Sequence, residues 1–213
     1  MWYFAIKRSI DIVGSLILLV IFSPIIAISA FAIKLSSKGP IFADTPPRIG
    51  QNGKPFYAYK FRTMIINAYE LLKTDPKFKK AFKEQQDGGN YKIKDDPRIT
   101  KIGKILRRHS IDEIPQLVNV IKGEMSIVGP RPYYAEELEI QQKKYPGTDK
   151  YVKQMLKVKP GITGFWQVTG RSEVNFDQRI KMDAYYAQKK SLFLDFLILL
   201  KTPVVMLSGK GAM

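Results

Sequence analysis

The stretch IVGSLILLVIFSPIIAISAFAI, residues 12–33, decides how this chain is organised. It contains no charged residue, and as a helix its 22 residues would extend about 33 Å, enough to cross the roughly 30 Å hydrocarbon layer of a bilayer. Three interpretations compete: a cleaved signal peptide, a helix that spans the membrane, and a re-entrant hairpin whose two ends stay on one face. The run is long for a signal peptide and has Asp11 at its mouth, which disfavours the first interpretation.

Ser23-Pro24 lies in the middle of this run and favours the re-entrant interpretation. Proline deletes a backbone hydrogen bond and bends a helix, although kinked spanning helices also exist. Residues 12–22 and 25–36 would each extend roughly 17 Å, about half of the bilayer. Positive residues prefer the cytosolic side, and they flank the run at both ends, at Lys7, Arg8, Lys34 and Lys38. We therefore expect residues 1–38 to form a helix-break-helix membrane segment with both ends cytosolic.

Asp11 would be costly to bury in lipid, because a charged side chain inside the bilayer loses its hydration. Lys7 and Arg8 lie four and three positions earlier, on the same helical face. We expect Asp11 to pair with one of these two residues, and a solvated surface charge is the alternative.

The composition restricts the chemistry available to the rest of the chain. With no Cys and a single His, thiol nucleophiles, disulfides, Cys/His zinc sites and most Ser-His-Asp schemes are excluded. Catalysis would have to use carboxylates, Lys, Arg, Tyr, hydroxyls or a hard cation with oxygen ligands. The 35 basic residues against 19 acidic ones imply an anionic partner, whether nucleic acid, phospholipid headgroups or phosphorylated substrates.

Residues 39–213 read as one mixed polar domain of the α+β class, mostly helical. Turn signals flank short apolar runs at 41–42 and 56–61, which predicts a hairpin or small sheet. Residues 65–86 read as one amphipathic helix, followed by a glycine-rich loop at 88–90. Further helical spacing is found at 100–106 and 111–121, and at 192–207 as an interfacial or core helix.

Asp112-Glu113 is an adjacent acid pair at or near the start of a predicted helix. Acidic residues favour the first helical turn, so a helix-start device is the ordinary explanation of such a pair. Its neighbours make it more interesting, because cations and hydroxyls at a helix start suit phosphate oxygens. These neighbours are Arg107, Arg108, His109 and Ser110. A carboxylate here could be a nucleophile, a base or a metal ligand.

Two further segments could hold a phosphorylated ligand. Gly129-Pro130-Arg131-Pro132 is a rigid turn that presents an arginine fork suited to a diphosphate, or a simple exposed loop. Residues 160–171 combine three glycines, an aromatic pair and a final arginine, which fits close approach to a ligand or a tight turn packed beneath a core Trp. The sequence contains neither a Walker loop nor a dinucleotide fingerprint.

Seven ordered motifs make the chain resemble the bacterial sugar transferase family, the small monotopic phosphoglycosyl transferases. The resemblance covers the chain nearly end to end. The motifs are Lys7-Arg8-Ser9-Ile10-Asp11, Ser23-Pro24, Lys60-Phe61-Arg62-Thr63-Met64, Asp96-Pro97-Arg98-Ile99-Thr100, Ser110-Ile111-Asp112-Glu113-Ile114-Pro115-Gln116, Gly129-Pro130-Arg131-Pro132 and the block from Pro160 to Arg171. His109, Ile111 and Ile114 depart mildly from the family's usual residues.

The resemblance implies transfer of a sugar 1-phosphate from a UDP-sugar to a polyprenyl phosphate, with release of UMP, on the cytosolic face of the bacterial inner membrane. It implies that Asp112 attacks the β-phosphorus to form a covalent phosphosugar-aspartate and that Glu113 helps to hold Mg²⁺. The resemblance assigns substrate binding to further residues, namely Arg107 and Arg131 at the phosphates, Lys7, Arg8 and Asp11 at the headgroup region, Lys60 and Arg62 along the site by looser analogy, and Thr163, Gln167 and Arg171 in the last block. Within the resemblance, the sequence Phe165-Trp166-Gln167 favours UDP-glucose or UDP-galactose as the sugar donor.

Two other hypotheses remain open from the sequence. Asp112 could act only as a base that activates the lipid acceptor in a one-step transfer. The chain could instead be a basic, membrane-anchored scaffold or nucleic-acid-binding protein without catalysis. The family resemblance favours anionic membrane lipids over nucleic acid as partners, and the oligomeric state is not readable from the sequence.

Overall fold

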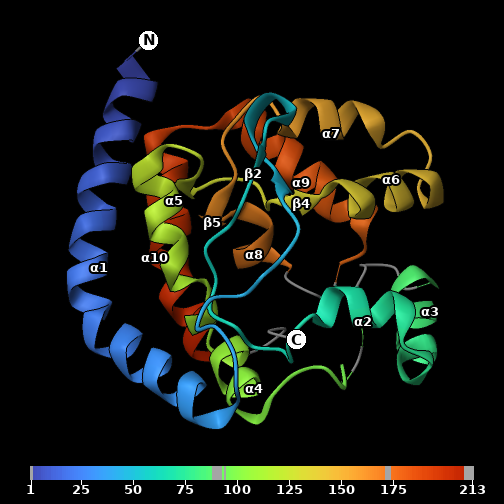
Figure 1. Ribbon diagram of the computed structural model, residues 1–213. Helices are drawn as coiled ribbons and strands as arrows, with labels where there is room; N and C mark the ends of the chain where they lie inside the picture. Colours follow the sequence, from blue (N-terminus) through green and yellow to red (C-terminus); the bar gives the residue numbers. More distant parts are fainter. Residues whose placement is uncertain (1, 88–92, 94, 171–173, 209–213) are drawn as a thin grey trace.

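The computed structural model describes residues 2–87, 93, 95–170 and 174–208 as a mostly helical protein with little sheet (Figure 1). This confirms the predicted α+β class. The α-helices are α1 (Trp2–Ser36), α2 (Ala68–Thr74), α3 (Lys79–Asp87), α4 (Lys101–Arg108), α5 (Leu117–Lys122), α6 (Ala135–Lys144), α7 (Asp149–Met155), α8 (Phe165–Thr169), α9 (Phe176–Lys189) and α10 (Leu192–Ser208). Short 3₁₀ helices are η1 (Gln51–Gly53), η2 (Pro76–Phe78) and η3 (Ile111–Gln116).

Two small sheets connect distant parts of the chain. The antiparallel sheet has the order β2-β1-β4, and the parallel pair joins β3 to β5. The strands are β1 (Arg48–Ile49), β2 (Pro55–Phe56), β3 (Ser126–Val128), β4 (Tyr133–Tyr134) and β5 (Gly161–Thr163). The predicted hairpin is present, because β1 pairs with β2 and a further antiparallel bridge joins Phe42 to Phe61.

The helix predicted over residues 65–86 is wrong, because the structure has α2, η2 and α3 there. Asp75 is extended, with φ −85° and ψ 120°. The reason is Pro76, whose ring disfavours helical backbone angles in the residue before it. The loop predicted at residues 88–90 lies outside the described residues.

Helix α1 is continuous through Pro24, so the predicted break is a curved helix and not two separate ones (Figure 1). Pro24 cannot donate to the carbonyl of Val20, four residues earlier. The hydroxyl of Ser23 donates to that carbonyl instead, at 2.7 Å. This bond explains how the helix passes a proline in an exposed apolar stretch without leaving the carbonyl unpaired.

Helix α1 packs on the rest of the protein through both of its arms. Its buried residues are Asp11, Ser15, Ser29 and Ile33, each pair one helical turn apart on one side of Pro24. The first pair faces β3, and Ile33 packs with Phe61 of the connecting segment in a cluster of buried apolar side chains. Most apolar side chains between the two pairs are exposed.

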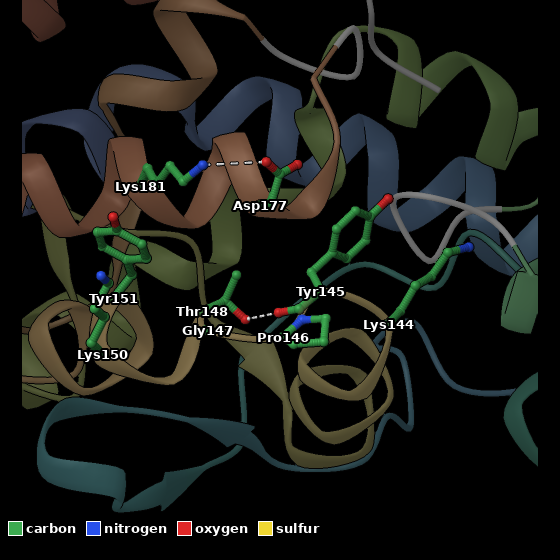
Figure 2. A pocket seen from close by; sticks show the side chains of 9 residues that line it. All are labelled: Lys144, Tyr145, Pro146, Gly147, Thr148, Lys150, Tyr151, Asp177 and Lys181. Carbon is green, nitrogen blue, oxygen red and sulfur yellow. Dashed lines mark hydrogen bonds and ion pairs between the residues drawn. The ribbon is translucent and has the colours of Figure 1, made fainter.

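An open hollow of about 480 Å³ lies where α6 ends and α7 and α9 begin (Figure 2). Lysines and tyrosines provide much of its lining, and Asp177 and Lys181 of α9 form an ion pair at its wall at 3.4 Å. None of the residues predicted to form the site lines it.

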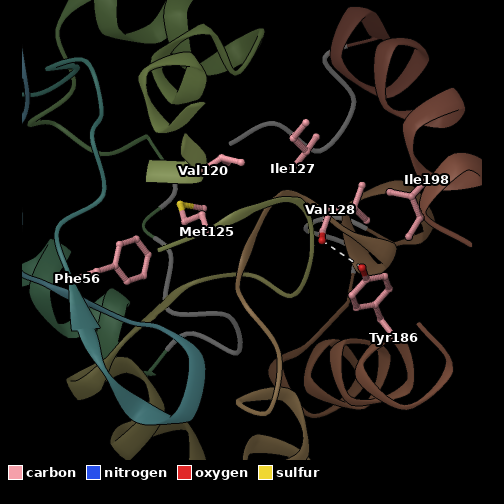
Figure 3. Close-up of a cluster of buried hydrophobic side chains, with 7 residues drawn as sticks. All are labelled: Phe56, Val120, Met125, Ile127, Val128, Tyr186 and Ile198. Atoms are coloured by element: carbon pink, nitrogen blue, oxygen red, sulfur yellow. Dashed lines mark hydrogen bonds between the residues drawn. The ribbon is translucent and has the colours of Figure 1, made fainter. Parts of the chain in front are cut away.

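The main apolar core lies between the sheets and the last two helices (Figure 3). It joins Val120 and Met125, at and after the end of α5, to Val128 of β3 and Ile198 of α10. The Tyr186 hydroxyl donates to the carbonyl of Val128 at 3.1 Å and so finds a partner inside this core. The core therefore fixes α5, which follows the acid pair, against β3, which precedes Arg131.

Candidate active site

The acid pair Asp112-Glu113 lies in the first turn of η3, as the sequence predicts. Thr100 caps the preceding helix α4 by accepting a hydrogen bond from Gly103 N at 2.9 Å. Ser110 then adopts a left-handed conformation, with φ 55°, between α4 and η3. This conformation is uncommon for a residue with a side chain and turns the chain sharply. It directs the acid pair back toward the segment that carries Lys60.

Lys60 bridges the two carboxylates of the pair. Its Nζ lies 2.7 Å from Asp112 Oδ2, an ion pair without good hydrogen-bond alignment, and donates to Glu113 Oε1 at 3.1 Å. A backbone hydrogen bond from Phe61 N to Asp112 O, at 3.0 Å, holds the two segments together. The Asp112 side chain is 3% exposed and that of Glu113 is 29% exposed. Asp112 is therefore enclosed, whereas Glu113 reaches the surface.

Two opposing effects, burial and nearby charges, determine the pKa values of Lys60 and Glu113. Burial alone would lower the pKa of Lys60, but the carboxylates of Asp112 and Glu113 outweigh it and hold this pKa above its ordinary value. Burial alone would raise the pKa of Glu113, but Lys60, Arg131 and Arg48 together hold it below its ordinary value. The cluster therefore stays charged at neutral pH, with Glu113 as carboxylate and Lys60 as ammonium.

Two arginines predicted to bind phosphates lie within electrostatic reach of this cluster. Arg107, in the last turn of α4, acts on Lys60 as a like charge. Arg131 and Glu113 attract each other, although burial opposes the charge of each. The Arg131 Nε is buried and has no hydrogen-bond partner among the described residues. A buried Nε–H without a partner, near an acid pair, is a donor that an anionic ligand would satisfy.

The turn that carries Arg131 is held rigidly by neighbouring backbone. Gly161 N donates to Pro130 O at 2.8 Å, and Gly129 N donates to Thr163 O at 2.9 Å. A Cβ on Gly161 would lie 2.0 Å from Gly129 N, so only glycine allows this close approach. The two predicted glycine-containing segments are thus one structural unit, which the sequence could not indicate.

The last of the predicted segments, residues 160–171, supports the turn that carries Arg131 through these backbone contacts. The Thr163 hydroxyl pairs with that of Thr202 in α10 at 2.8 Å. Gln167 donates to Ile162 O at 3.0 Å, and its Oε1 is buried without a partner among the described residues. Arg171 lies outside the described residues. A role of these three residues in substrate binding stays a prediction.

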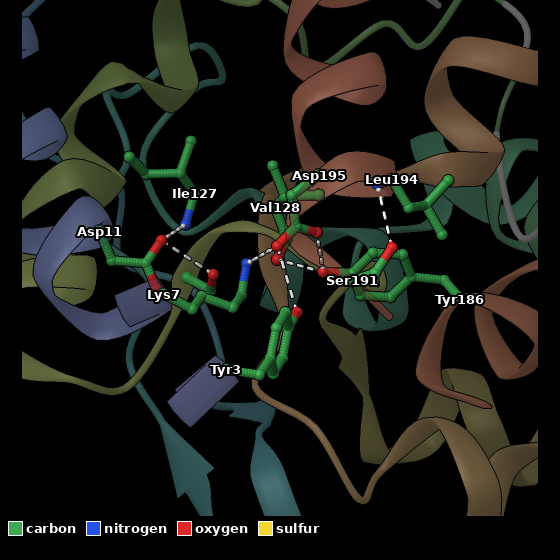
Figure 4. Close-up of polar contacts among 10 residues, drawn as sticks. Tyr3, Lys7, Asp11, Ile127, Val128, Tyr186, Ser191, Leu194 and Asp195 are labelled. Carbon is green, nitrogen blue, oxygen red and sulfur yellow. Dashed lines mark hydrogen bonds and ion pairs between the residues drawn. The ribbon is translucent and has the colours of Figure 1, made fainter. Parts of the chain in front are cut away.

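The three residues predicted at the headgroup region attach α1 to the domain, and their role at a headgroup stays a prediction. The predicted pairing of Asp11 with Lys7 or Arg8 is wrong, and Figure 4 shows the partners of Asp11 and Lys7. Asp11 is 4% exposed and accepts hydrogen bonds from Ser126 Oγ and Ile127 N, both at 3.0 Å. Lys7 pairs with Asp195 of α10 at 2.9 Å. Arg8 donates to the Val120 and Ile121 carbonyls, at the end of α5. Helix spacing could not reveal these partners, because they lie more than 100 residues away along the chain.

Arg62 was grouped with Lys60 by its motif, but the two side chains have different surroundings. The Arg62 guanidinium donates to Pro40 O at 2.6 Å and to the hydroxyl and carbonyl of Ser37. All three nitrogens therefore bind the chain that leaves α1. Lys60, in contrast, directs its side chain to the acid pair.

The sequence analysis missed several residues around Arg131. Arg48 of β1 donates to Pro132 O at 3.0 Å and stacks on Tyr134 with its guanidinium carbon 3.5 Å from the ring centroid. Arg179 and Asp183 of α9 are buried beneath the same turn. A signal for these two was present: they are charged residues one helical turn apart, on the face that also carries Phe176 and Ile180.

The described residues contain no group of three or more His, Asp or Glu side chains that could hold a metal ion alone. Mg²⁺ commonly binds one or two carboxylates together with substrate phosphates and water. Glu113, partly exposed beside Asp112, fits that limited contribution.

Residues 2–209 match the family model described as bacterial sugar transferase. The chain belongs to this family, as the motifs predict. Among its relatives, an uncharacterized sugar transferase of Haemophilus influenzae is 43% identical over 211 residues, covering 97% of this chain and 42% of that protein. The undecaprenyl-phosphate galactose phosphotransferase of Salmonella typhimurium is 40% identical over 211 residues, covering 97% of this chain and 41% of that protein.

The chain covers a larger share of a shorter relative. The exopolysaccharide production protein ExoY of Sinorhizobium fredii is 41% identical over 207 residues, which is 95% of this chain and 86% of that protein. The chain thus spans about two fifths of the length of the first two relatives and most of the third.

Proposed function

We propose that this protein is a phosphoglycosyl transferase that moves a sugar 1-phosphate from a UDP-sugar to polyprenyl phosphate, such as undecaprenyl phosphate, and releases UMP. The observation that carries the proposal is the enclosed Asp112 beside Lys60 and Glu113, with the buried, unpartnered Nε of Arg131 within electrostatic reach of the pair. Family membership and the name of the Salmonella relative, undecaprenyl-phosphate galactose phosphotransferase, support the substrate class. The relatives' names also favour a role in assembling exopolysaccharide or a related lipid-linked glycan.

In the proposed first step, a carboxylate oxygen of Asp112 attacks the β-phosphorus of the UDP-sugar. The new bond joins that oxygen to phosphorus, and the bond from the β-phosphorus to the bridging oxygen breaks, so UMP leaves with the bridging oxygen. In the second step an oxygen of polyprenyl phosphate attacks the same phosphorus and the aspartyl oxygen leaves. A carboxylate nucleophile thereby divides one transfer into two displacements.

The cations around Asp112 suit this chemistry. Phosphoryl transfer is catalysed mainly by positioning and by stabilising charge on the phosphate oxygens. Lys60 would orient the nucleophile, and Arg131 and Arg107 would neutralise the diphosphate. Glu113 would hold Mg²⁺, which when bound supplies further positive charge at the phosphates.

We further propose that α1 is re-entrant, so that the protein enters one leaflet from the cytosolic face of the inner membrane. Helix α1 is long and apolar enough to cross a bilayer, yet Asp11 and Ile33 are both buried against one domain. These residues are separated by about 33 Å of helix, so a crossing α1 would place its two packed ends on opposite sides. The curvature at Pro24 and the exposed apolar side chains between the two ends support the re-entrant arrangement.

Asp112→Asn tests the nucleophile. We expect it to abolish UMP release from UDP-galactose and UDP-glucose while leaving membrane association intact, because the amide is a poor nucleophile. Asp149→Asn, at an exposed residue of α7, is the matched control and should retain full activity. Turnover by Asp112→Asn would refute the assignment. A phosphosugar trapped on the wild-type protein, but not on the variant, distinguishes two displacements from a one-step transfer.

The absence of Cys makes the topology directly measurable. Single cysteines replacing Ser9 and Lys34, both exposed at opposite ends of the apolar run, can be labelled with an impermeant maleimide. We expect both to react only from the cytosolic side. Reaction of the two from opposite sides would show that α1 spans the membrane.

A further inference from the structure

Beneath the Arg131 turn lies a group of buried polar and aromatic side chains that the proposed reaction does not use. They come from four elements: Tyr133 of β4, Glu137 of α6, Trp166 of α8, and Arg179 and Asp183 of α9. Each is less than 5% exposed. Burying ionised side chains is costly unless they are paired, so their place directly under Arg131 calls for an explanation.

The carboxyl group of Asp183 contacts the hydroxyl of Tyr133 and the backbone of the Arg131 turn. Its Oδ2 accepts a hydrogen bond from the Tyr133 hydroxyl at 3.2 Å. The backbone N–H of Arg131 also acts on the carboxyl group as a hydrogen-bond donor. The other oxygen, Oδ1, is buried without a hydrogen-bond partner among the described residues. Asp183 therefore lies against the peptide group of Arg131 with one oxygen unsatisfied.

Arg179 and Arg131 share the same two aromatic rings. The guanidinium carbon of Arg179 lies 5.3 Å from the Tyr133 centroid and 5.4 Å from that of Trp166. The corresponding distances for Arg131 are 5.8 and 5.9 Å. The carboxylate of Glu137 is 3.8 Å from Arg179, too far for a strong hydrogen bond. Arg131 thus has a like charge behind it and Glu113 in front of it.

We propose that Asp183 is a positioning residue that acts through Arg131 on binding of the diphosphate of the nucleotide sugar. An ionised Asp183 draws the positive charge of Arg131 and Arg179 inward and weakens the attraction for an anion at the acid pair. A neutral Asp183 leaves that charge available to the diphosphate. The inference rests on the proposed function, because it takes the diphosphate as the ligand of Arg131.

Because of its surroundings, the carboxyl group of Asp183 gains or loses its proton near neutral pH. Burial raises the pKa of Asp183 to about 7, although the positive charge of Arg179, the hydroxyl of Tyr133 and the backbone and side chain of Arg131 all oppose the rise. The carboxylate of Glu137 on α6 acts on the neighbouring Tyr133 as a negative charge. Because a bound anion favours the protonated carboxyl group, linkage requires tighter diphosphate binding below this pH than above it.

The experiment measures binding of UDP-galactose and UDP-glucose by calorimetry, in the Asp112→Asn background to prevent turnover. The diphosphate of these compounds keeps a constant charge between pH 6 and pH 8. We expect affinity to fall about three- to tenfold from pH 6 to pH 8, the effect of one added charge at this range. In Asp183→Asn the affinity should stay at its pH 6 value throughout.

The matched control is Asp177→Asn, on the same helix. Residues 177 and 183 lie on different faces of α9, about 120° apart, and Asp177 faces the hollow of Figure 2. This variant should keep the pH dependence of the parent. If Asp183→Asn only loosens the fold, its melting temperature falls while the pH dependence of affinity remains, and the inference is overturned. If neither sugar nucleotide binds at any pH, the proposed function fails and the inference fails with it.

Discussion

Replacing Asp195 should show how firmly α1 is attached to the rest of the protein. Asp195 of α10 is buried and accepts hydrogen bonds from Tyr3 at 3.1 Å, Lys7 at 2.9 Å and Tyr186 at 2.6 Å (Figure 4). Asp195→Ala removes the partner of two α1 side chains at once. Tyr186 can still donate to Val128 O, so losing its hydrogen bond to Asp195 should cost little stability.

The magnitude follows from burial. Removing one partner of a buried ion pair costs about 3–5 kcal/mol, because the other charge is left unpaired. The Lys7 side chain is 16% exposed and can recover some hydration, so we expect about 3 kcal/mol for Asp195→Ala. For a protein of this size each kcal/mol shifts the melting temperature by about 2–4 °C, which gives a decrease of about 6–12 °C.

The control is an ion pair of similar length on the surface. Glu139 and Lys143 of α6 lie 2.7 Å apart with side chains 67% and 74% exposed. Glu139→Ala should cost less than about 0.5 kcal/mol, because water screens this pair. Thermal unfolding in nanodiscs measures both variants. An Asp195→Ala shift no larger than that of Glu139→Ala would refute the reasoning from burial.

A double-mutant cycle separates the pair from general damage. Asp195→Ala and Lys7→Met, alone and combined, should give a coupling free energy of about 1.5–3 kcal/mol, in the range expected for contacting residues. A coupling near zero would mean that Asp195 stabilises the protein through Tyr3 or Tyr186 and not through Lys7.

Three further predictions concern the site and the two arms of α1. Gly161→Ala would place a methyl group 2.0 Å from a backbone nitrogen of the facing segment, so we expect loss of folded protein by size-exclusion chromatography, and normal yield would contradict the close contact. Lys60→Gln should lower stability by about 2 kcal/mol, the worth of a charged hydrogen bond. The lowered pKa of Glu113 contributes stability above its ordinary value of 4.5 and loses it as the pH falls, while the raised pKa of Lys60 contributes below 10.5 and loses it as the pH rises. The wild-type and variant unfolding curves should therefore differ most between these limits and converge in acid. Ile33→Ala, at a buried position, should cost about 2–5 kcal/mol, whereas Ile28→Ala, 69% exposed on the same helix, should leave the domain's stability unchanged, and equal costs would argue against docking of the second arm.

Several elements could be predicted because their signals are local. The bend of α1 at its proline, the acid pair at a helix start and the hairpin near residues 41–61 all follow from residue types at short spacing. The helix predicted wrongly over residues 65–86 also had a local signal, since Pro76 disfavours helical backbone angles at the residue before it. That error came from following hydrophobic spacing through a proline.

The partners of charged residues could not be predicted in the same way. Asp11 has two basic neighbours on its own helical face, yet its carboxylate binds Ser126 and Ile127. Leaving a buried donor or acceptor without a partner costs more free energy than an exposed ion pair contributes. Asp11 therefore binds Ser126 and Ile127, and the local ion pair with Lys7 or Arg8 does not form. Such competition is settled only when distant segments meet.

The sequence by itself determined that a bent apolar segment precedes a basic domain, and that an acid pair begins a helix among arginines. Tertiary structure alone decided that Lys60 bridges that pair and that Asp183 lies beneath Arg131. Each of these contacts joins residues about 50 positions apart. Helical and strand periodicity carries information over a few residues, whereas the position of one buried charge relative to another is set by how the intervening elements pack.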